Sequence, residues 1–167
     1  MRRAVQEAAV ILLKFATEIK GSSTVDGFTD WINVDSMQLG VGRSVALQAG
    51  GSSKREVSSP SLSEITFSRT SDKAAPELFF QACGGVSLGT CTVNILQVIE
   101  NKPKVFVTLL LEESMISTYN MSSGGDTPTE SFSVNFTKIS FQYDTFDGKK
   151  VVTGTPKKWD LAKNITY

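Results

Sequence analysis

The side chains of this chain that could do acid–base chemistry are mainly carboxylates, because the sequence contains no histidine. A Ser-His-Asp triad, a Cys-His dyad and a histidine zinc motif are therefore excluded. Glu112 and Glu113 are adjacent, but neighbouring residues of a strand point to opposite faces and cannot serve one site. Asp126, Asp144 and Asp147 fall in turns and are too widely spaced for a calcium loop. We expect no catalytic residue and no metal site.

The two cysteines, Cys83 and Cys91, form neither a disulfide framework nor a Cys-x-x-Cys metal motif. Free cysteine behaves as a small apolar side chain, so we expect both to be buried. The glycine clusters Gly40–Gly42 and Gly84–Gly85 match neither the dinucleotide fingerprint nor the phosphate-binding loop. They predict turns and a helix end, and the sequence indicates no cofactor.

The balance of charge narrows the range of partners. With 17 basic and 17 acidic side chains in 167 residues, the chain lacks the basic excess of a nucleic-acid-binding protein, so no nucleic acid is expected. Weak like-charge repulsion permits self-association. In the first 13 residues, Gln6 and Glu7 interrupt a short apolar run and no small-residue cleavage site follows. We predict neither a signal peptide nor a membrane span.

The elements that would position any functional residue are mostly strands. β-Branched and aromatic residues, with turn signals every dozen or so residues, predict an antiparallel β-sandwich or β-barrel with one short flanking α-helix. We expect a single domain over residues 1–167, with 1–8 as a variable extension. The expected strands are Val10–Ile19, Asp30–Leu39, Leu62–Arg69, Thr92–Glu100, Val105–Glu112, Met115–Met121, Ser131–Phe146, Val151–Thr153 and Trp159–Tyr167.

The long strand Ser131–Phe146 changes its alternation within the segment. The apolar face is Phe132, Val134 and Phe136 before the change and Ile139, Phe141 and Tyr143 after it. A one-residue slip at Thr137–Lys138 predicts a bulge, or a strand that bends from one sheet into another as at a barrel corner.

One helix is indicated around Pro76, which suits a first helical turn because no intrahelical bond from its nitrogen is needed there. Ala75, the expected cap position, offers no side-chain acceptor, so the helix start should be weak. Gly84–Gly85 ends the helix. The expected apolar stripe comprises Leu78, Phe79, Ala82 and Cys83.

The segment Gly40–Pro60 is long and rich in glycine and serine. A connection of this length inside a compact domain is uncommon and is usually either functional or disordered. It is the most unusual feature of a sequence in which no active site can be identified.

Three segments, taken in order, resemble one family. Ser61–Gly85 (SLSEITFSRTSDKAAPELFFQACGG) resembles the strand and proline-started helix of the haemolysin-coregulated proteins (Hcp), the tube proteins of bacterial type VI secretion. Ser122–Tyr143 is similar to the family's Gly-rich turn and long barrel strand, and Trp159–Asn164 (WDLAKN) is similar to its ending. The resemblance covers about residues 10–167 and depends on the order of the segments, because no single motif is decisive.

The resemblance implies a barrel-like fold with one flanking helix, similar to that of phage tail tubes. Six copies would form a ring, and stacked rings would form a tube that carries effector proteins and works with sheath and spike or baseplate proteins. Such a subunit is made in the bacterial cytoplasm, is secreted without a signal peptide and is not an enzyme. By position, Gly40–Pro60 corresponds to the loop that reaches a neighbouring ring, and Ser36 and Gln38 face the channel. The stacking residues implied are Arg43, Gln48, Lys54, Arg55 and Glu56.

Two other classes of function stay open from the residues alone. A monomeric β-sandwich binding module, such as an adhesin or carbohydrate reader, would present exposed aromatic side chains in a cleft. An enzyme without histidine would need a carboxylate pair, or a lysine or cysteine nucleophile in a pocket.

Overall fold

The computed structural model describes residues 9–47, 55–148 and 150–167, and within them the chain forms two large antiparallel sheets, three two-stranded ribbons and one helix. The strands of the first sheet are β1 (Val10–Phe15), β2 (Ile32–Val34), β9 (Cys91–Ile99), β10 (Lys102–Glu112), β13 (Lys138–Tyr143) and β16 (Lys157–Asp160). The strands of the second are β3 (Ser36–Gln38), β8 (Ile65–Thr70), β11 (Met115–Ser122) and β12 (Thr129–Asn135). Their orders are β16-β13-β10-β9-β1-β2 and β11-β12-β8-β3.

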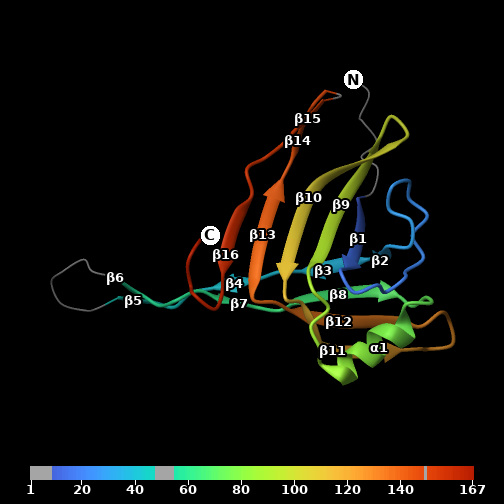
Figure 1. Cartoon of the computed structure of the whole chain (residues 1–167), viewed down its shortest axis with the longest axis horizontal. Coiled ribbons are helices and arrows are strands. Elements are labelled where there is room, and N and C mark those ends of the chain that lie inside the picture. Colours follow the sequence, from blue (N-terminus) through green and yellow to red (C-terminus); the bar gives the residue numbers. More distant parts are fainter. Residues whose placement is uncertain (1–8, 48–54, 149) are drawn as a thin grey trace.

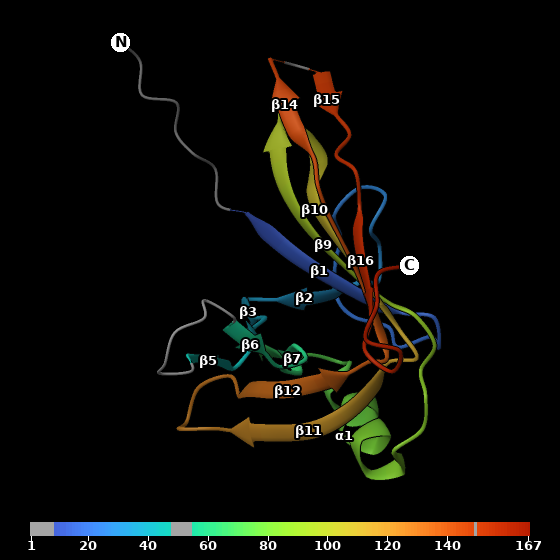
Figure 2. The ribbon, with the colours of Figure 1, turned by 90° about the vertical axis from the view of Figure 1, so that its left-hand side faces the viewer.

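The strands of the two sheets run in crossing directions. In Figure 1 the six-stranded sheet stands upright and the four-stranded sheet lies beneath it, with the helix at its lower edge. Figure 2 shows the same layers from the side. The mostly antiparallel β fold predicted from the sequence is confirmed.

The core fills the space between the sheets. Phe15 of β1 and Leu109 of β10 are fully buried, as are Phe67 of β8 and Phe132 of β12. The rings of Phe67 and Phe132, which are direct cross-strand partners, stack with 5.3 Å between their centroids. Such aromatic pairs stabilise a sheet beyond the area that they bury.

The chain passes from one sheet to the other at the predicted phase change. β12 ends at Asn135 in the four-stranded sheet, and β13 begins at Lys138 in the six-stranded sheet. At this corner the Thr137 N–H donates to the Glu112 carbonyl oxygen over 3.1 Å, and the Leu161 N–H donates to the Thr137 carbonyl oxygen over 2.9 Å. The slip in alternation therefore marks the bend that lets one segment serve both sheets.

Several predicted strand limits need correction. Segment 30–39 is not one strand: a second corner at Asp35 divides it into β2 and β3, which belong to different sheets. The first strand ends at Phe15 rather than Ile19. In the β9–β10 hairpin the turn is Glu100–Asn101, where both residues have positive φ, so β10 begins earlier than predicted. A two-residue turn of this kind matches the twist of the strands that it joins.

Other predicted limits differ as well, and the last strand, expected over Trp159–Tyr167, is β16, which begins at Lys157 and ends at Asp160. Segment 131–146 is interrupted at both ends of β13, and its last part forms β14 (Thr145–Asp147), which pairs with β15 (Lys150–Val152). Asp147 is the last residue of β14 rather than part of the turn, and Gly148, which follows it, adopts a φ of +60°. Turns with positive φ favour glycine because it has no Cβ.

Helix α1 (Ala75–Gly84) lies where it was predicted, but it buries a narrower stripe. Ala75 and Leu78 are buried, whereas Phe79 and Cys83 are exposed, so the expected burial of these two side chains was wrong. The helix packs on β11, which is an edge strand. A single strand beneath the helix covers only a narrow row of the helix side chains. Burial of Cys91 is confirmed.

The ends of α1 are set by backbone contacts. The cap residue is Ala74 rather than Ala75, and it makes no side-chain cap bond. Asp72 compensates, because its carboxylate accepts a hydrogen bond from the Ala74 N–H over 2.8 Å. Gly85 ends the helix with a left-handed φ of 62°, as the sequence predicts.

Residues 40–63, which we call the arm, were expected as an open loop, but the described parts, 40–47 and 55–63, form a paired ribbon. The arm contains β4 (Val41–Gly42), β5 (Val45–Leu47), β6 (Arg55–Val57) and β7 (Ser61–Leu62), and β4 pairs with β7 and β5 with β6. At its base the Ser63 N–H donates to the Gly40 carbonyl oxygen over 3.0 Å. Figure 1 shows the arm projecting from the body of the molecule.

A close backbone approach predicts a large effect of one methyl group. At Gly21 a Cβ would lie 2.5 Å from the Ile32 Cα and against the Trp31 carbonyl group. We expect Gly21→Ala to lower the free energy of unfolding by about 1 to 3 kcal/mol, since backbone must shift to admit the methyl group. Gly124→Ala is the matched control, because a Cβ there meets no atom within 4 Å. Equal urea midpoints for the two variants would contradict this prediction.

Candidate functional site

The four-stranded sheet carries a continuous polar face on the side opposite the core. Directly paired residues of a sheet share a face, and the outward pairs on β3, β8, β12 and β11 are uncharged and polar, with the exception of Met115, which pairs with Asn135. These residues, which we call the polar face, are Ser36, Gln38, Thr66, Ser68, Thr70, Thr118, Asn120, Ser122, Thr129, Ser131 and Ser133. The hydroxyl oxygens of Thr66 and Ser133 lie 3.0 Å apart in a hydrogen bond across two strands.

Both residues that the resemblance placed at a channel belong to this polar face. Ser36 pairs with Ser68, and Gln38 pairs with Thr66. In the sequence, Thr66 and Ser68 alternate with the apolar Ile65 and Phe67, and this alternation alone indicates no role for them. Only the register of β8 against β12 extends the face to Ser131 and beyond.

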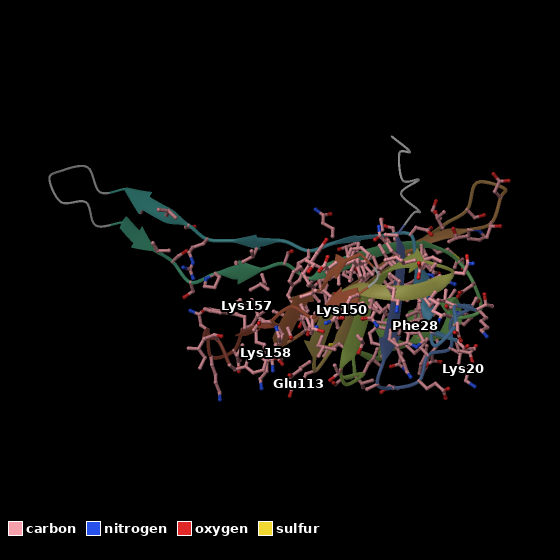
Figure 3. The ribbon with its side chains drawn as sticks, turned by 90° about the horizontal axis from the view of Figure 1, so that it is seen from above. Lys20, Phe28, Glu113, Lys150, Lys157 and Lys158 are labelled. Atoms are coloured by element: carbon pink, nitrogen blue, oxygen red, sulfur yellow. The ribbon has the colours of Figure 1, made fainter. Side chains whose placement is uncertain are left out.

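The residues predicted to stack rings are distributed along the arm. Arg43 is exposed between β4 and β5. Arg55 and Glu56 belong to β6 and pair in register with β5. Gln48 and Lys54 lie outside the described residues. The arm continues directly from β3 and into β8, so the same sheet that carries the polar face also positions the arm. Figure 3 shows from above how far the ribbon extends beyond Lys157 and Lys158.

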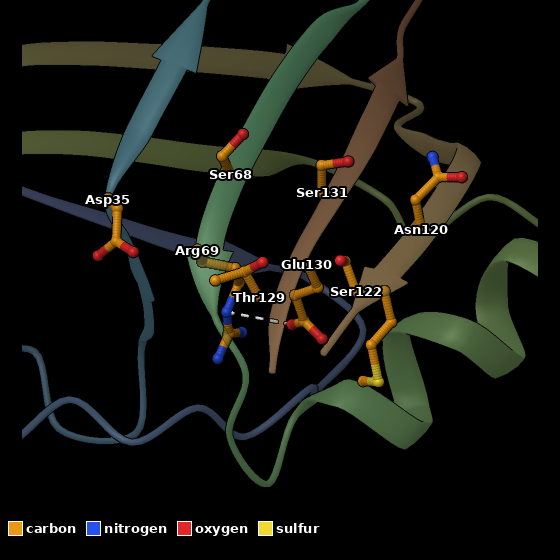
Figure 4. A pocket seen from close by; sticks show the side chains of 9 residues that line it. Asp35, Ser68, Arg69, Asn120, Ser122, Thr129, Glu130 and Ser131 are labelled. Atoms are coloured by element: carbon orange, nitrogen blue, oxygen red, sulfur yellow. Dashed lines mark ion pairs between the residues drawn. The ribbon is translucent and has the colours of Figure 1, made fainter. Parts of the chain in front are cut away.

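A buried ion pair lies at the end of the four-stranded sheet opposite the arm. Arg69 of β8 and Glu130 of β12 are cross-strand partners on the core side, with Arg69 Nε and Glu130 Oε1 3.2 Å apart. Their side chains are only 1% and 0% exposed. The Arg69 guanidinium also pairs with Asp72, which lies just before α1. The cluster joins the ends of two strands to the segment that leads into the helix. Figure 4 shows the pair Arg69 and Glu130.

Two further hydroxyl groups complete the coordination of Glu130. The Tyr119 hydroxyl donates to Glu130 Oε2 over 2.6 Å, and the Ser71 hydroxyl donates to the same oxygen over 3.3 Å. Burial and the hydrogen bond to Glu130 raise the pKa of the Tyr119 hydroxyl. Arg69 Nη1 is buried without a hydrogen-bond partner. Each carboxylate of the cluster is nevertheless paired with Arg69, so the arrangement holds elements together rather than offering a free acid or base.

The pKa of Asp72 reports the strength of its contacts. Burial would raise the pKa of this carboxyl, but hydrogen bonds from Arg69 and from the Ala74 N–H, together with the charge of Arg69, outweigh burial. The pKa is therefore held below the ordinary value of 3.8. The ionised form of Asp72 is the one that the folded chain stabilises.

Two cavities open near this end of the sheet. One, of about 260 Å³, is lined by polar-face residues of β8, β11 and β12, by the ion pair Arg69–Glu130, by Met121 and by the exposed Asp35. The other, of about 520 Å³, is a groove between α1 and β11 that is lined by Ala75, Pro76, Phe79, Tyr119, Asn120 and Met121. Phe79 and Met121 are more than half exposed, so an apolar strip is accessible in the groove.

The adjacent carboxylates do not converge on one site. Glu112 Oε1 accepts a hydrogen bond from the Tyr167 hydroxyl over 3.0 Å, whereas Glu113 Oε2 accepts from the Thr137 hydroxyl over 3.0 Å. Cys91 is fully buried, and burial raises the pKa of its thiol, which disfavours a nucleophilic thiolate. Among the residues that the structure describes, no three histidine, cysteine or acidic side chains gather as metal ligands would.

No helix within the described ranges is both long and apolar enough to cross a membrane.

Comparison with solved structures defines the class of protein. A structure described as "Structure of a type six secretion system protein" superposes with a TM-score of 0.86 at 21% identity, covering 96% of this chain and all of that one. Hcp1 from Salmonella typhimurium gives 0.76 at 20% identity, covering 96% and 99% of the two chains. The secreted protein Hcp3 from Pseudomonas aeruginosa gives 0.63 at 15% identity, covering 92% and 98%. The crossed-sheet sandwich with its arm is thus the fold of type VI secretion Hcp proteins.

The sequence itself assigns the family. The profile of the family described as "Type VI secretion system effector, Hcp" matches residues 12–143. The chain therefore belongs to the Hcp family and is a tube protein of the type VI secretion system. No curated protein matches the chain by sequence. The family resemblance drawn from the three segments is confirmed, and it takes precedence over the monomeric binding module.

Proposed function

We propose that six copies of this chain close into a ring whose channel is walled by the polar face. The observation that carries the proposal is the row of hydroxyl and amide side chains at the paired outward positions of the four strands, where Met115 is the one apolar residue among the described pairs and no charged residue is paired. A wall made mostly of hydroxyl and amide groups stays hydrated and offers little apolar area for a passing protein to bury. Ser36 and Gln38 lie in this wall and face the channel.

Rings stack through the arm into a tube. In support, the strands of the arm pair with each other, and the ribbon that they form projects from the body, where another ring can contact it. The residues assigned to stacking are Arg43, Gln48, Lys54, Arg55 and Glu56.

The tube carries effector proteins and works with the sheath and with spike or baseplate proteins. The chain acts as a structural subunit rather than as an enzyme, and it folds as a single domain. Assembly takes place in the bacterial cytoplasm, and export follows without a signal peptide. Membership of a family of secreted tube proteins supports each of these statements.

Native mass spectrometry tests ring formation directly. We expect a species of six times the 18.1 kDa chain mass, because an open two-sheet sandwich leaves strand edges that neighbouring copies can cover. Analytical ultracentrifugation over a hundredfold range of concentration is the complementary measurement. A strictly monomeric chain throughout that range would contradict the ring.

A further inference from the structure

The arm and the groove beside α1 lie at opposite ends of one sheet. The arm leaves the four-stranded sheet where β3 ends and β8 begins. The groove lies where β11 ends and α1 begins. Since β3, β8, β12 and β11 are antiparallel neighbours in that order, these two places are the two ends of the sheet. One copy therefore presents an arm at one end and a groove at the other.

The two ends carry opposite charge. Residues 40–63 contain three basic side chains and one acidic side chain. The far end, which we define as residues 30–35, 69–77 and 120–130, contains six acidic and two basic side chains. Arg69 is neutralised there by Glu130 and Asp72, and Lys73 Nζ lies 3.4 Å from Asp30 Oδ1. The far end thus attracts a basic ribbon, and complementary charge fixes the orientation of docking partners.

The arm also has an apolar face without cover. Val45 and Val57 are direct cross-strand partners and so share one face of the ribbon, where they are 54% and 50% exposed. A two-stranded ribbon alone in water is marginally stable, and apolar pairs on its surface gain by being buried. The groove offers a complementary apolar strip in Phe79 and Met121, which are 56% and 51% exposed.

We propose that the groove between α1 and β11 receives the Val45–Val57 face of the arm of a second copy, arranged head to tail. This inference rests on the proposed tube and names the acceptor site for its stacking contact. From β4 to the end of β5 the arm is seven residues long, which at 3.3 Å per residue spans about 20 Å. That reach carries the valine pair past the end of its own sheet and over the far end of the next copy. A contact between unlike ends is heterologous and can repeat from ring to ring.

A disulfide trap tests the contact. In a Cys83→Ser background, the pair Val57→Cys and Met121→Cys should give a ladder of covalent multimers when assembled tubes are oxidised and run on a non-reducing gel. Val57→Cys combined with Val98→Cys is the matched control, because Val98 is also exposed but lies on β9 of the other sheet. A ladder that stops at dimers, or an equal ladder in the control pair, would overturn the inference.

A pair of adjacent exposed phenylalanines gives a second readout that does not depend on oxidation. Phe79→Lys places a cation in the groove and should reduce the stacked fraction about tenfold in sedimentation, with rings intact. Phe80→Lys, at a position that is 63% exposed and does not line the groove, should leave stacking unchanged.

The outcomes separate this inference from the function on which it rests. Normal tubes from the Phe79→Lys chain, with no ladder from the trapped pair, would place the acceptor elsewhere and leave the tube proposal intact. If the unmodified chain forms no rings at all, the proposed function fails, and this inference fails with it.

Discussion

Replacement of Arg69 by methionine should lower the free energy of unfolding by about 3 to 5 kcal/mol. The substitution removes the cation from a cluster in which Glu130 is fully buried and Asp72 is largely so. The two carboxylates would then be held without compensation in a poorly solvated place, which costs more than the pair itself contributes. Urea unfolding at one fixed protein concentration measures the change, since assembly makes apparent stability depend on concentration.

Two further variants serve as controls for this prediction. Lys20→Met removes the cation from the ion pair with Glu18, whose side chains are 58% and 75% exposed, and should change stability by less than about 1 kcal/mol. Adding Glu130→Met to Arg69→Met should recover part of the loss, because it removes a stranded charge. Equal effects of Arg69→Met and Lys20→Met would show that the buried cluster contributes nothing particular.

The same cluster predicts how the free energy of unfolding depends on pH. The pKa of Asp72 is lower in the folded chain than its ordinary value of 3.8, so the folded chain favours the ionised form. The stability that Asp72 contributes is therefore complete above that ordinary value and is lost as pH falls through the lower folded pKa. The difference between the unmodified chain and Arg69→Met should shrink over that acidic range and stay constant near neutral pH.

Deletion of residues 50–56 should abolish stacking while leaving rings. The deletion removes Arg55 and Glu56, two of the three residues of β6, together with the five residues that precede them. The body should be unaffected, because the arm is held at its base by the backbone bonds between Gly40 and Ser63 and between Ser44 and Ser58. Electron micrographs should show isolated rings, with the thermal midpoint of the ring preparation changed little.

A second variant, in which seven glycine and serine residues replace residues 50–56, distinguishes two explanations for the loss of ring stacking. If side chains of the arm make the contact, this variant fails to stack like the deletion; if length alone matters, it stacks like the unmodified chain. Tubes formed as readily by the deleted chain would show that the arm is not the stacking element.

Alternation predicted much of the fold, because a strand with one buried face must repeat every two residues. The phase change in 131–146 predicted the corner correctly, since no single face can accommodate both apolar sets. The corner at Asp35 carries a similar slip, because the apolar positions change there from Ile32 and Val34 to Met37 and Leu39. Trp31 alternates in step with Met37 and Leu39, so the segment also fits a single strand that is apolar on both faces, and pairing with different neighbours decides between the two. The narrow buried stripe of α1 likewise depends on how much of a partner strand lies beneath the helix.

The charged cluster was missed for a related reason. Alternation from Ile65 through Phe67 places Arg69 inward, and the same counting from Val134 places Glu130 inward. Each charge alone contradicts a buried position, and only the register of β8 against β12 shows that they neutralise each other. The groove beside α1 is equally invisible in the sequence, because its walls come from segments about 40 residues apart.

The direct continuation of the arm into β8 has a mechanical consequence. Figure 1 shows the arm running along the direction of the strand that it enters, and that strand is bonded on both sides, to β3 and to β12. Ladder bonds of antiparallel strands lie perpendicular to the strands, so tension applied along the arm loads many of them simultaneously in shear. Peeling, in which bonds break one after another, requires a pull across the strands instead. The body therefore resists a longitudinal pull with the combined strength of two ladders, in the middle of the sheet rather than at its edge.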